Sequence, residues 1–312
     1  MTITAGHGSA VYPLGVATSG WAYLAAMIVA YGFANLLQSV AAARTRHEKR
    51  FHPSLLLRLC RDWTYIVGVV CQFTGFLLAF FARRELPLFL VQASMAAGLG
   101  VTALLGVVVL KWRLPAAEVI LLAALCAGVT GLIISAEPGP SRPIGFGGDV
   151  GLGVAIGLIA LAGLFAVRMR GAPGSVALGS LAGLAFGAAA VASRPLAAVH
   201  SWDRFVADPL LYLLLAHTIL GQLLLGLAMQ RGSTTAAVAG MDAASAAPAG
   251  AVGLLMLGDR IWPGREWMAA LGFLLTLGAV LLLTRYAEPQ HHHAHNQRRP
   301  AFRDRIIDVT PV

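Results

Sequence analysis

The chain has 312 residues, of which 58% are hydrophobic and 12% are charged, and its formal net charge is +9. A soluble domain usually has about 25% charged residues, so this composition excludes an ordinary soluble globular protein. The positive charge needs no nucleic-acid partner, because much of it lies where anionic lipid would meet it.

In chain order, the apolar residues form nine blocks of roughly 20 residues, the length that crosses about 30 Å of hydrocarbon. We expect an all-α integral membrane protein with nine transmembrane helices, at 20–42, 62–82, 87–110, 116–135, 148–169, 174–194, 208–230, 235–257 and 267–284. Four spans form a first half (20–135), a linker follows (136–147), and five spans form a second half (148–284). Residues 1–19 lack the Lys or Arg that opens a signal peptide, and 285–312 are predicted to be a disordered polar tail.

The distribution of Lys and Arg predicts an orientation, because these residues favour the cytoplasmic side of a membrane. With the N-terminus outside, 16 of them fall in cytoplasmic segments. The opposite side holds seven: Arg83, Arg84, Arg142, Arg194, Arg204, Arg260 and Arg265. We therefore expect a multi-pass protein of the plasma membrane with a cytoplasmic C-terminus. Arg83 and Arg84 lie against the bias.

One stretch of the chain occurs twice. Gly106 to Leu114 reads GVVVLKWRL, and Gly253 to Ile261 reads GLLMLGDRI, each followed by a Pro, a Glu and another apolar run. Spans two to four (62–135) thus match spans seven to nine (208–284). Because the displacement is five spans, matching helices cross the membrane in opposite directions. This predicts an inverted structural repeat with a substrate site near the midplane, between the halves.

The second copy also carries a family resemblance. The run LMLGDRI at Leu255 to Ile261, followed by Gly278 in an apolar helix, resembles the end of an EamA-type repeat of the drug/metabolite transporter superfamily. Asp259 stands where that family usually has Glu, and the first copy departs further, with Lys111 and Trp112. Residues 84–87 resemble the family's link between its third and fourth helices. The resemblance implies a secondary transporter, with export as the direction. The nine-span layout is similar to the NIPA-like branch, which implies magnesium transport.

Polar residues inside the spans are the candidates for substrate binding and ion coupling. Asp242 is the only acidic residue well inside a span, and an intramembrane carboxylate is a functional-site candidate by default. It could carry a proton, attract a cation, or pair structurally with a neighbouring helix. A histidine titrates near neutral pH, and buried amides must find hydrogen bonds to a helix or a ligand. The candidates are Asp242, His217, Gln222, Gln72, Gln92 and Ser245.

Glycine spacing predicts close helix packing. Gly179, Gly183 and Gly187 share one face of span six, and Gly153 and Gly157 share a face of span five. Small residues four apart let helices approach closely. We expect a tight crossing at span six, within one chain or between two copies in a homodimer.

Three function classes remain. The spacing of the three cysteines fits no metal site, and no nucleotide loop or catalytic set appears, so we expect no enzyme, no cofactor and no metal centre. The favoured class is a proton-coupled secondary transporter of a small polar metabolite, with the small-molecule substrate and membrane lipid as partners. The alternatives are a divalent-cation permease, for which one carboxylate is thin, and a non-transporting membrane scaffold. A shared cavity at Asp242, His217, Gln72 and Gln222 would favour transport.

Overall fold

The computed structural model describes residues 14–45, 62–110, 114–231 and 234–296. Its long helices are α1 (Leu14–Thr45), α3 (Trp63–Ala82), α6 (Ala116–Ser135), α7 (Gly145–Ala166), α8 (Gly171–Leu196), α10 (Pro209–Arg231), α11 (Thr234–Leu255) and α12 (Glu266–Asn296). Shorter elements are α4 (Leu88–Met95), α5 (Ala97–Leu110), α9 (Trp202–Ala207), β1 (Ala136–Glu137) and β2 (Arg260–Ile261). Within these ranges, nine spans are long and apolar enough to cross a membrane, with α4 and α5 together forming one. The predicted number of spans is matched.

Local chemistry explains where several helices begin. The Asp62 side chain accepts a hydrogen bond from the Thr64 amide at 2.8 Å and so caps α3. Pro87 and Pro115 precede α4 and α6, where a missing amide proton costs nothing. Two features were not predicted: the pairing of β1 with β2, and the length of α12, which continues twelve residues beyond 284.

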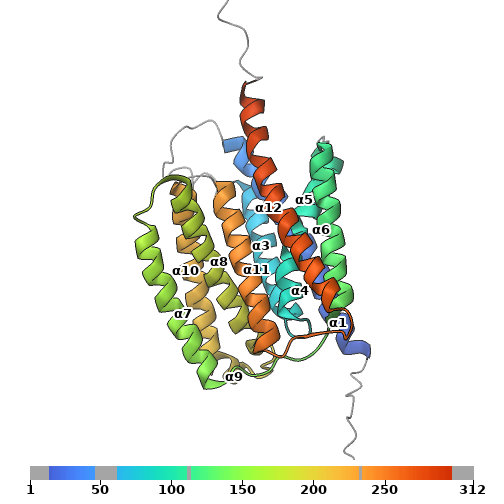
Figure 1. Cartoon of the computed structure of the whole chain (residues 1–312), viewed down its shortest axis with the longest axis vertical. Helices are drawn as coiled ribbons and strands as arrows, with labels where there is room; N and C mark the ends of the chain where they lie inside the picture. Colours follow the sequence, from blue (N-terminus) through green and yellow to red (C-terminus); the bar gives the residue numbers. More distant parts are fainter. Residues whose placement is uncertain (1–13, 46–61, 111–113, 232–233, 297–312) are drawn as a thin grey trace, which may run out of the picture.

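The helices form a bundle with a distinct pattern of neighbours (Figure 1). Helix α1 packs along α3 and α5, α8 packs along α10 and α11, and α6 packs along α12. Helix α4 lies among these groups and contacts α1, α6, α8, α11 and α12. The described chain starts at the end of the bundle that carries α9, and α12 leaves from the opposite end. We call the end of the bundle that carries α9 the α9 end.

The glycine prediction is confirmed for α8 and wrong for α7. A Cβ at Gly179 or Gly183 would overlap the backbone of α11 at Ala237 or Met241, and one at Gly187 would lie 2.9 Å from the Ser245 carbonyl oxygen. The close crossing is therefore within one chain. By contrast, a Cβ at Gly153 or Gly157 meets no described atom within 4 Å, because these glycines face away from the neighbouring helices.

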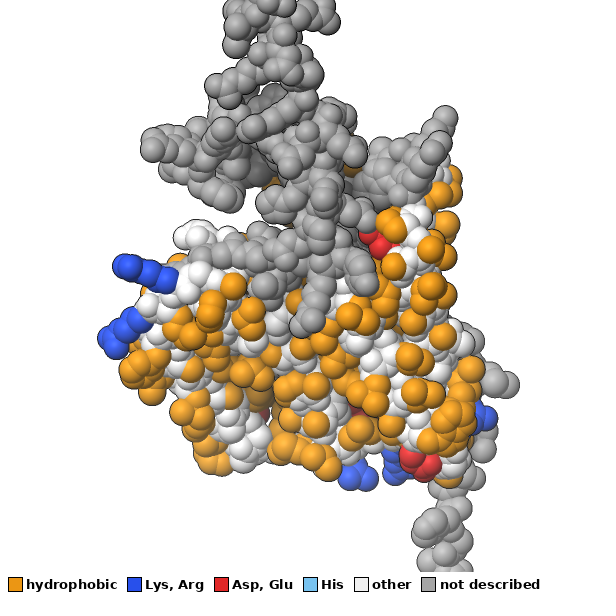
Figure 2. Space-filling model, turned by 45° about the horizontal axis from the view of Figure 1, so that its top comes forward, with side chains coloured by type: hydrophobic (Ala, Val, Ile, Leu, Met, Phe, Trp, Pro, Cys, Tyr) orange, Lys and Arg blue, Asp and Glu red, His pale blue; other side chains and the backbone are white. Residues whose placement is uncertain are grey.

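The outer surface of the bundle is apolar around its sides. Figure 2 shows hydrophobic side chains over the visible lateral face, with charged ones near the ends. Leu104, Leu158 and Leu274 are each more than 60% exposed. A contiguous apolar surface of this extent suits lipid rather than water, in agreement with a multi-pass membrane protein.

Candidate functional site

The third span is interrupted where the two central helices meet. Helix α4 ends at Met95 and α5 begins at Ala97, with the amides of Ala96 and Leu99 bonded three residues back rather than four. The predicted repeat relates this span to α11, which contains an internal proline, Pro248. Gly- or Pro-interrupted segments at corresponding positions of two halves are the usual pointer to a transporter's binding site. The interrupted span packs on α11 through α4.

A chain of hydrogen bonds crosses this contact. Arg83 donates from Nη2 to Oε1 of Gln92 at 2.8 Å, and Gln92 donates from Nε2 to Oγ of Ser245 at 3.0 Å. The other terminal nitrogen of Arg83 donates to Oγ of Ser193 at 3.2 Å. We call this set the Arg83–Gln92–Ser245 chain. It links α3, α4, α8 and α11, and runs from a fully buried cation to a half-buried hydroxyl.

Asp242 lies three residues before Ser245 and therefore on nearly the same side of α11. Its carboxylate is half-buried and makes no hydrogen bond or ion pair with any described residue. All of residues 238–246 are likewise half-buried, although α11 lies in the middle of the bundle. A central helix with partial exposure all round, and an acid without a partner, is what a site open to a polar ligand requires.

The other predicted residues do not join this site. Gln72 is exposed and its Oε1 accepts from Nε2 of Gln38 at 2.6 Å, which ties α3 to α1. Gln222 is exposed on α10. His217 is completely buried, and its Nδ1 donates to the Leu213 carbonyl oxygen at 2.9 Å, leaving Nε2 without a partner among the described residues. No hydrogen bond among the described residues joins Asp242, His217, Gln72 and Gln222, the four side chains whose shared cavity would favour transport. Gln92, Ser245 and Asp242 come together instead.

A second polar cluster, which the sequence did not predict, lies at the α9 end. Arg194 forms an ion pair with Asp259, with Nη2 and Oδ1 2.5 Å apart and both side chains almost completely buried. Arg194 also donates to the carbonyl oxygens of Arg83 and Leu86. The other carboxylate oxygen of Asp259 accepts from the Leu88 amide at 2.5 Å and so caps α4. One ion pair therefore holds α8, the segment after α11 and the start of α4 together.

The ion pair explains the glycines and the acid in the second copy of the repeated motif. A Cβ at Gly253 would overlap the Asp259 carboxylate, and Gly258 has a φ of +76°, which turns the chain after α11 so that Asp259 points inward. The two glycines and the acid are therefore one structural unit. The corresponding Lys111 and Trp112 of the first copy lie outside the described residues.

The buried charges at the α9 end do not balance. Burial lowers the pKa of Arg83 to about 10. This pKa is still well above neutral pH, so the guanidinium stays charged there. Its hydrogen-bond partners Gln92 and Ser193 are neutral, and the neighbouring Arg194 is already paired with Asp259. Glu85, close in sequence, is bonded instead to the Ser19 hydroxyl and the Gly20 amide. A positive field therefore lies behind Gln92. The signal available in the sequence was that, in the predicted orientation, Arg83 and Arg194 fall on the side where Lys and Arg are disfavoured.

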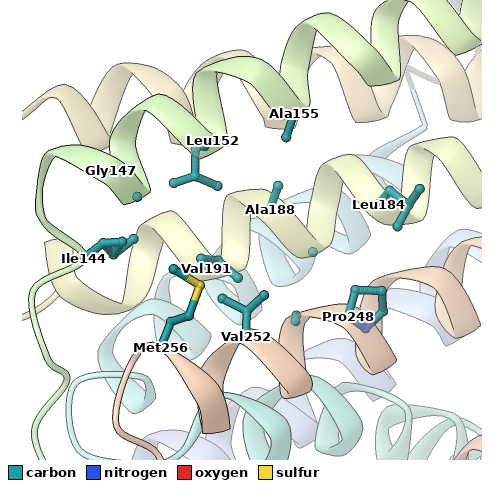
Figure 3. Close-up of a pocket in the computed structure, with 14 residues that line it drawn as sticks. Ile144, Gly147, Leu152, Ala155, Leu184, Ala188, Val191, Pro248, Val252 and Met256 are labelled. Carbon is teal, nitrogen blue, oxygen red and sulfur yellow. The ribbon is translucent and has the colours of Figure 1, made fainter.

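A separate apolar groove lies between α7 and α11, with α8 as its floor (Figure 3). Its volume is about 260 Å³, and Leu152 and Ala155, Ala188 and Val191, and Val252 point into it from the three helices. None of the six predicted site residues lines it. Within the described part of the chain, no group of three or more His, Cys, Asp or Glu is placed to hold a metal ion.

Comparisons with protein-family models, with curated proteins and with solved structures found no match.

Proposed function

We propose that the chain is a secondary transporter of a small polar solute, with its binding site formed by Asp242, Ser245 and Gln92. The observation that carries the proposal is the Gln92–Ser245 hydrogen bond between the interrupted third span and the proline-containing α11, one turn from a carboxylate with no partner among the described residues. The site offers amide and hydroxyl donors with the charge of Arg83 behind them, and an acidic acceptor beside them. A polar solute with both donors and acceptors satisfies such a set.

The packing supports transport by alternating access, in a state closed at the α9 end. At that end, α4 contacts α8 and α11 and is fixed there by the Arg194–Asp259 pair. Toward the other end, α5 packs on α1, α4 and α6 but makes no extensive contact with α8 or α11 among the described residues. Release of the ion pair and separation of α4 from α11 would open the closed end.

The neighbour pattern is also the one that the predicted inverted repeat requires. Helix α1 holds α3 and α5 in the first half, and α8 holds α10 and α11 in the second, while α6 and α12 meet across the halves. The resemblance to the drug/metabolite transporter superfamily, which rests on the motif at Asp259, points to the same class and to export. We place the α9 end outside and the C-terminus in the cytoplasm of a cell whose plasma membrane the chain spans. The glycine face of α8 is occupied within the chain, so a homodimer would need another surface.

Proton coupling is assigned to Asp242. In proteoliposomes loaded with small polar metabolites, Asp242→Asn should abolish uptake driven by a pH gradient while leaving exchange of solute at equal pH partly intact, since asparagine is nearly isosteric but cannot titrate. Thr130→Ala, which removes an exposed hydroxyl on α6, is the control and should transport as the parent does. Parental gradient-driven uptake by Asp242→Asn would refute the assignment.

Magnesium transport is the alternative that the partnerless carboxylate favours. Mg²⁺ keeps most of its waters and binds through one or two carboxylates, and Asp242 with the Ser245 and Gln92 oxygens supplies one acidic ligand. A magnesium-sensitive dye inside the same liposomes distinguishes the two functions. Magnesium influx that Asp242→Asn removes would replace metabolite transport as the function. Absence of flux for every solute and for magnesium would leave a membrane scaffold.

A further inference from the structure

The apolar groove between α7 and α11 exists because these two helices do not close on one another. Both pack on α8, but within the described ranges they make no extensive contact with each other. The groove walls are Gly151 and Ala155 of α7 and Val252 of α11, and no polar side chain lines it. Gly147, Gly151, Leu184, Pro248 and Met256 are all exposed, so the groove opens to the side of the bundle. Its occupant must therefore be apolar and must enter from the surroundings of the helices.

The dimensions of the groove select a single hydrocarbon chain. From Gly147 to Ala155 on α7, or from Pro248 to Met256 on α11, eight residues give a length of about 12 Å at the usual helical rise. This is most of the hydrocarbon depth of one leaflet, about 15 Å. A volume of about 260 Å³ over that length leaves a cross-sectional area on the order of 20 Å². A second helix, about 10 Å across, needs several times that area. A helix from another copy does not fit.

The groove also runs in the direction that a lipid takes. Ile144, Val191 and Met256 lie where α7 begins and where α8 and α11 approach their ends, so they mark the α9 end of the groove. Leu184, Ala155 and Pro248 lie deeper along the same helices. A chain entering from the interface at the α9 end would therefore lie parallel to the helices, with its tip near the middle of the bundle.

A cation lies at the interfacial end. Arg142 is two residues before Ile144, and its backbone amide donates to the Leu257 carbonyl oxygen at 2.8 Å, next to Met256. Its side chain lies over Gly258 and is exposed, with no acidic partner among the described residues. The acidic residue nearest to it along α7, Asp149, is not in the groove lining. Arginine binds phosphate through several donors at once, so the groove has an apolar trough and a phosphate-binding residue at its mouth.

We propose that this groove binds one acyl chain of a phospholipid whose phosphate lies against Arg142. The lipid fills the space that α7 and α11 leave open and contacts Pro248 of α11. This site is distinct from the Arg83–Gln92–Ser245 chain, which lies on the α4 side of α11. Lipid binding at this groove requires that the chain lies in a lipid bilayer, but it does not depend on the proposed transport function.

The test uses the full chain in nanodiscs of phosphatidylcholine containing a phospholipid with a photoactivatable acyl chain. Labelled positions are mapped by mass spectrometry. We expect labels at Ala155, Ala188 and Val252 to exceed severalfold those at Leu158 and Leu161, which are more exposed on the outer face of α7. Gly151→Leu fills the groove and should remove most of this excess.

Two controls keep the test decisive. Gly153→Leu adds the same side chain to α7, and at both glycines a Cβ meets no described atom within 4 Å, so both variants should fold, but only Gly151 lines the groove. Arg142→Gln should lower labelling by the phospholipid but not by a photoactivatable long-chain alcohol. Arg204→Gln, which changes an exposed arginine on α9, should lower neither.

Uniform labelling of all lipid-facing residues would overturn the proposal. Equal losses of groove labelling in Gly151→Leu and Gly153→Leu would also overturn it. So would a disulfide between two copies of Leu184→Cys, because it would place a second chain at the groove. Loss of transport with intact labelling would concern the proposed function alone.

Discussion

The ion pair between Arg194 and Asp259 gives the strongest test of how the α9 end is held together. Asp259→Leu leaves the Arg194 guanidinium, 1% exposed, without its counter-ion and removes the acceptor of the Leu88 amide. Removal of one partner from a buried ion pair typically destabilises a protein by about 3–5 kcal/mol. We expect a loss in that range, because both side chains are almost completely buried and the Asp259 carboxylate also caps α4.

The double variant Arg194→Met/Asp259→Leu separates pairing from desolvation. Replacement of both charges by apolar side chains of similar size is often neutral or stabilising by about 1–4 kcal/mol. Here it also removes the donors to three carbonyl oxygens, those of Arg83, Leu86 and Gly139, and the acceptor of the Leu88 amide, four hydrogen bonds worth about 1 kcal/mol each. This loss offsets or exceeds the gain, so the double variant should lie at or below the parent in stability but above the single variant.

The assay is equilibrium unfolding in mixed micelles with increasing SDS, followed by far-UV circular dichroism. Arg260→Ala, an exposed arginine next to Asp259, is the matched control and should unfold as the parent does. A double variant as unstable as Asp259→Leu, or a single variant that unfolds like the parent, would refute the role given to this pair.

Three further predictions concern the helix packing and the membrane topology. Gly183→Leu should destabilise the bundle by at least about 1–3 kcal/mol in the same unfolding assay, because its Cβ would overlap the Met241 carbonyl, whereas Gly153→Leu should change little. A double-mutant cycle with Gln38→Ala and Gln72→Ala should give a coupling energy of about 0.6 kcal/mol, the average for hydrogen bonds between membrane helices, and a value of zero would show that the bond does not form in lipid. A reporter active only in the cytoplasm should work when fused after residue 312 and fail when fused before residue 1, and the reverse result would invert the proposed topology.

The number and approximate bounds of the spans could be predicted from the sequence because hydropathy over about 20 residues reflects a physical requirement of the bilayer. The break at Ala96 could not, because the segment from Leu88 to Leu110 is apolar enough over its whole length for one span and contains no proline. The break separates α4, which contacts α8 and α11, from α5, which packs on α1 and α6. The start of α4 is fixed by Asp259, 171 residues away in sequence from Leu88. Contacts of that separation leave no local pattern.

The candidate site was predicted in part for the same reason. Asp242, Ser245 and Gln92 were found because polar side chains in apolar helices are costly and therefore conspicuous. Gln222 and Gln72 satisfy the same rule in sequence but are exposed, and Gln72 is hydrogen-bonded to Gln38. Which face of a helix points inward depends on hydrophobic contrast, and helices that are apolar all round provide almost none.

The buried arginines also bear on the orientation. Two of the seven Lys and Arg residues on the less basic side, Arg83 and Arg194, are almost completely buried and bonded within the bundle. The bias of Lys and Arg toward the cytoplasm concerns charges in short loops and next to the spans, and a guanidinium enclosed by four helices is held by its bonds rather than by the side of the membrane. With these two set aside, the remaining contrast is sharper than the sequence count. The residues that weaken the orientation argument are thus the ones that close the α9 end, and the proposal that this end lies outside depends on the remaining Lys and Arg residues.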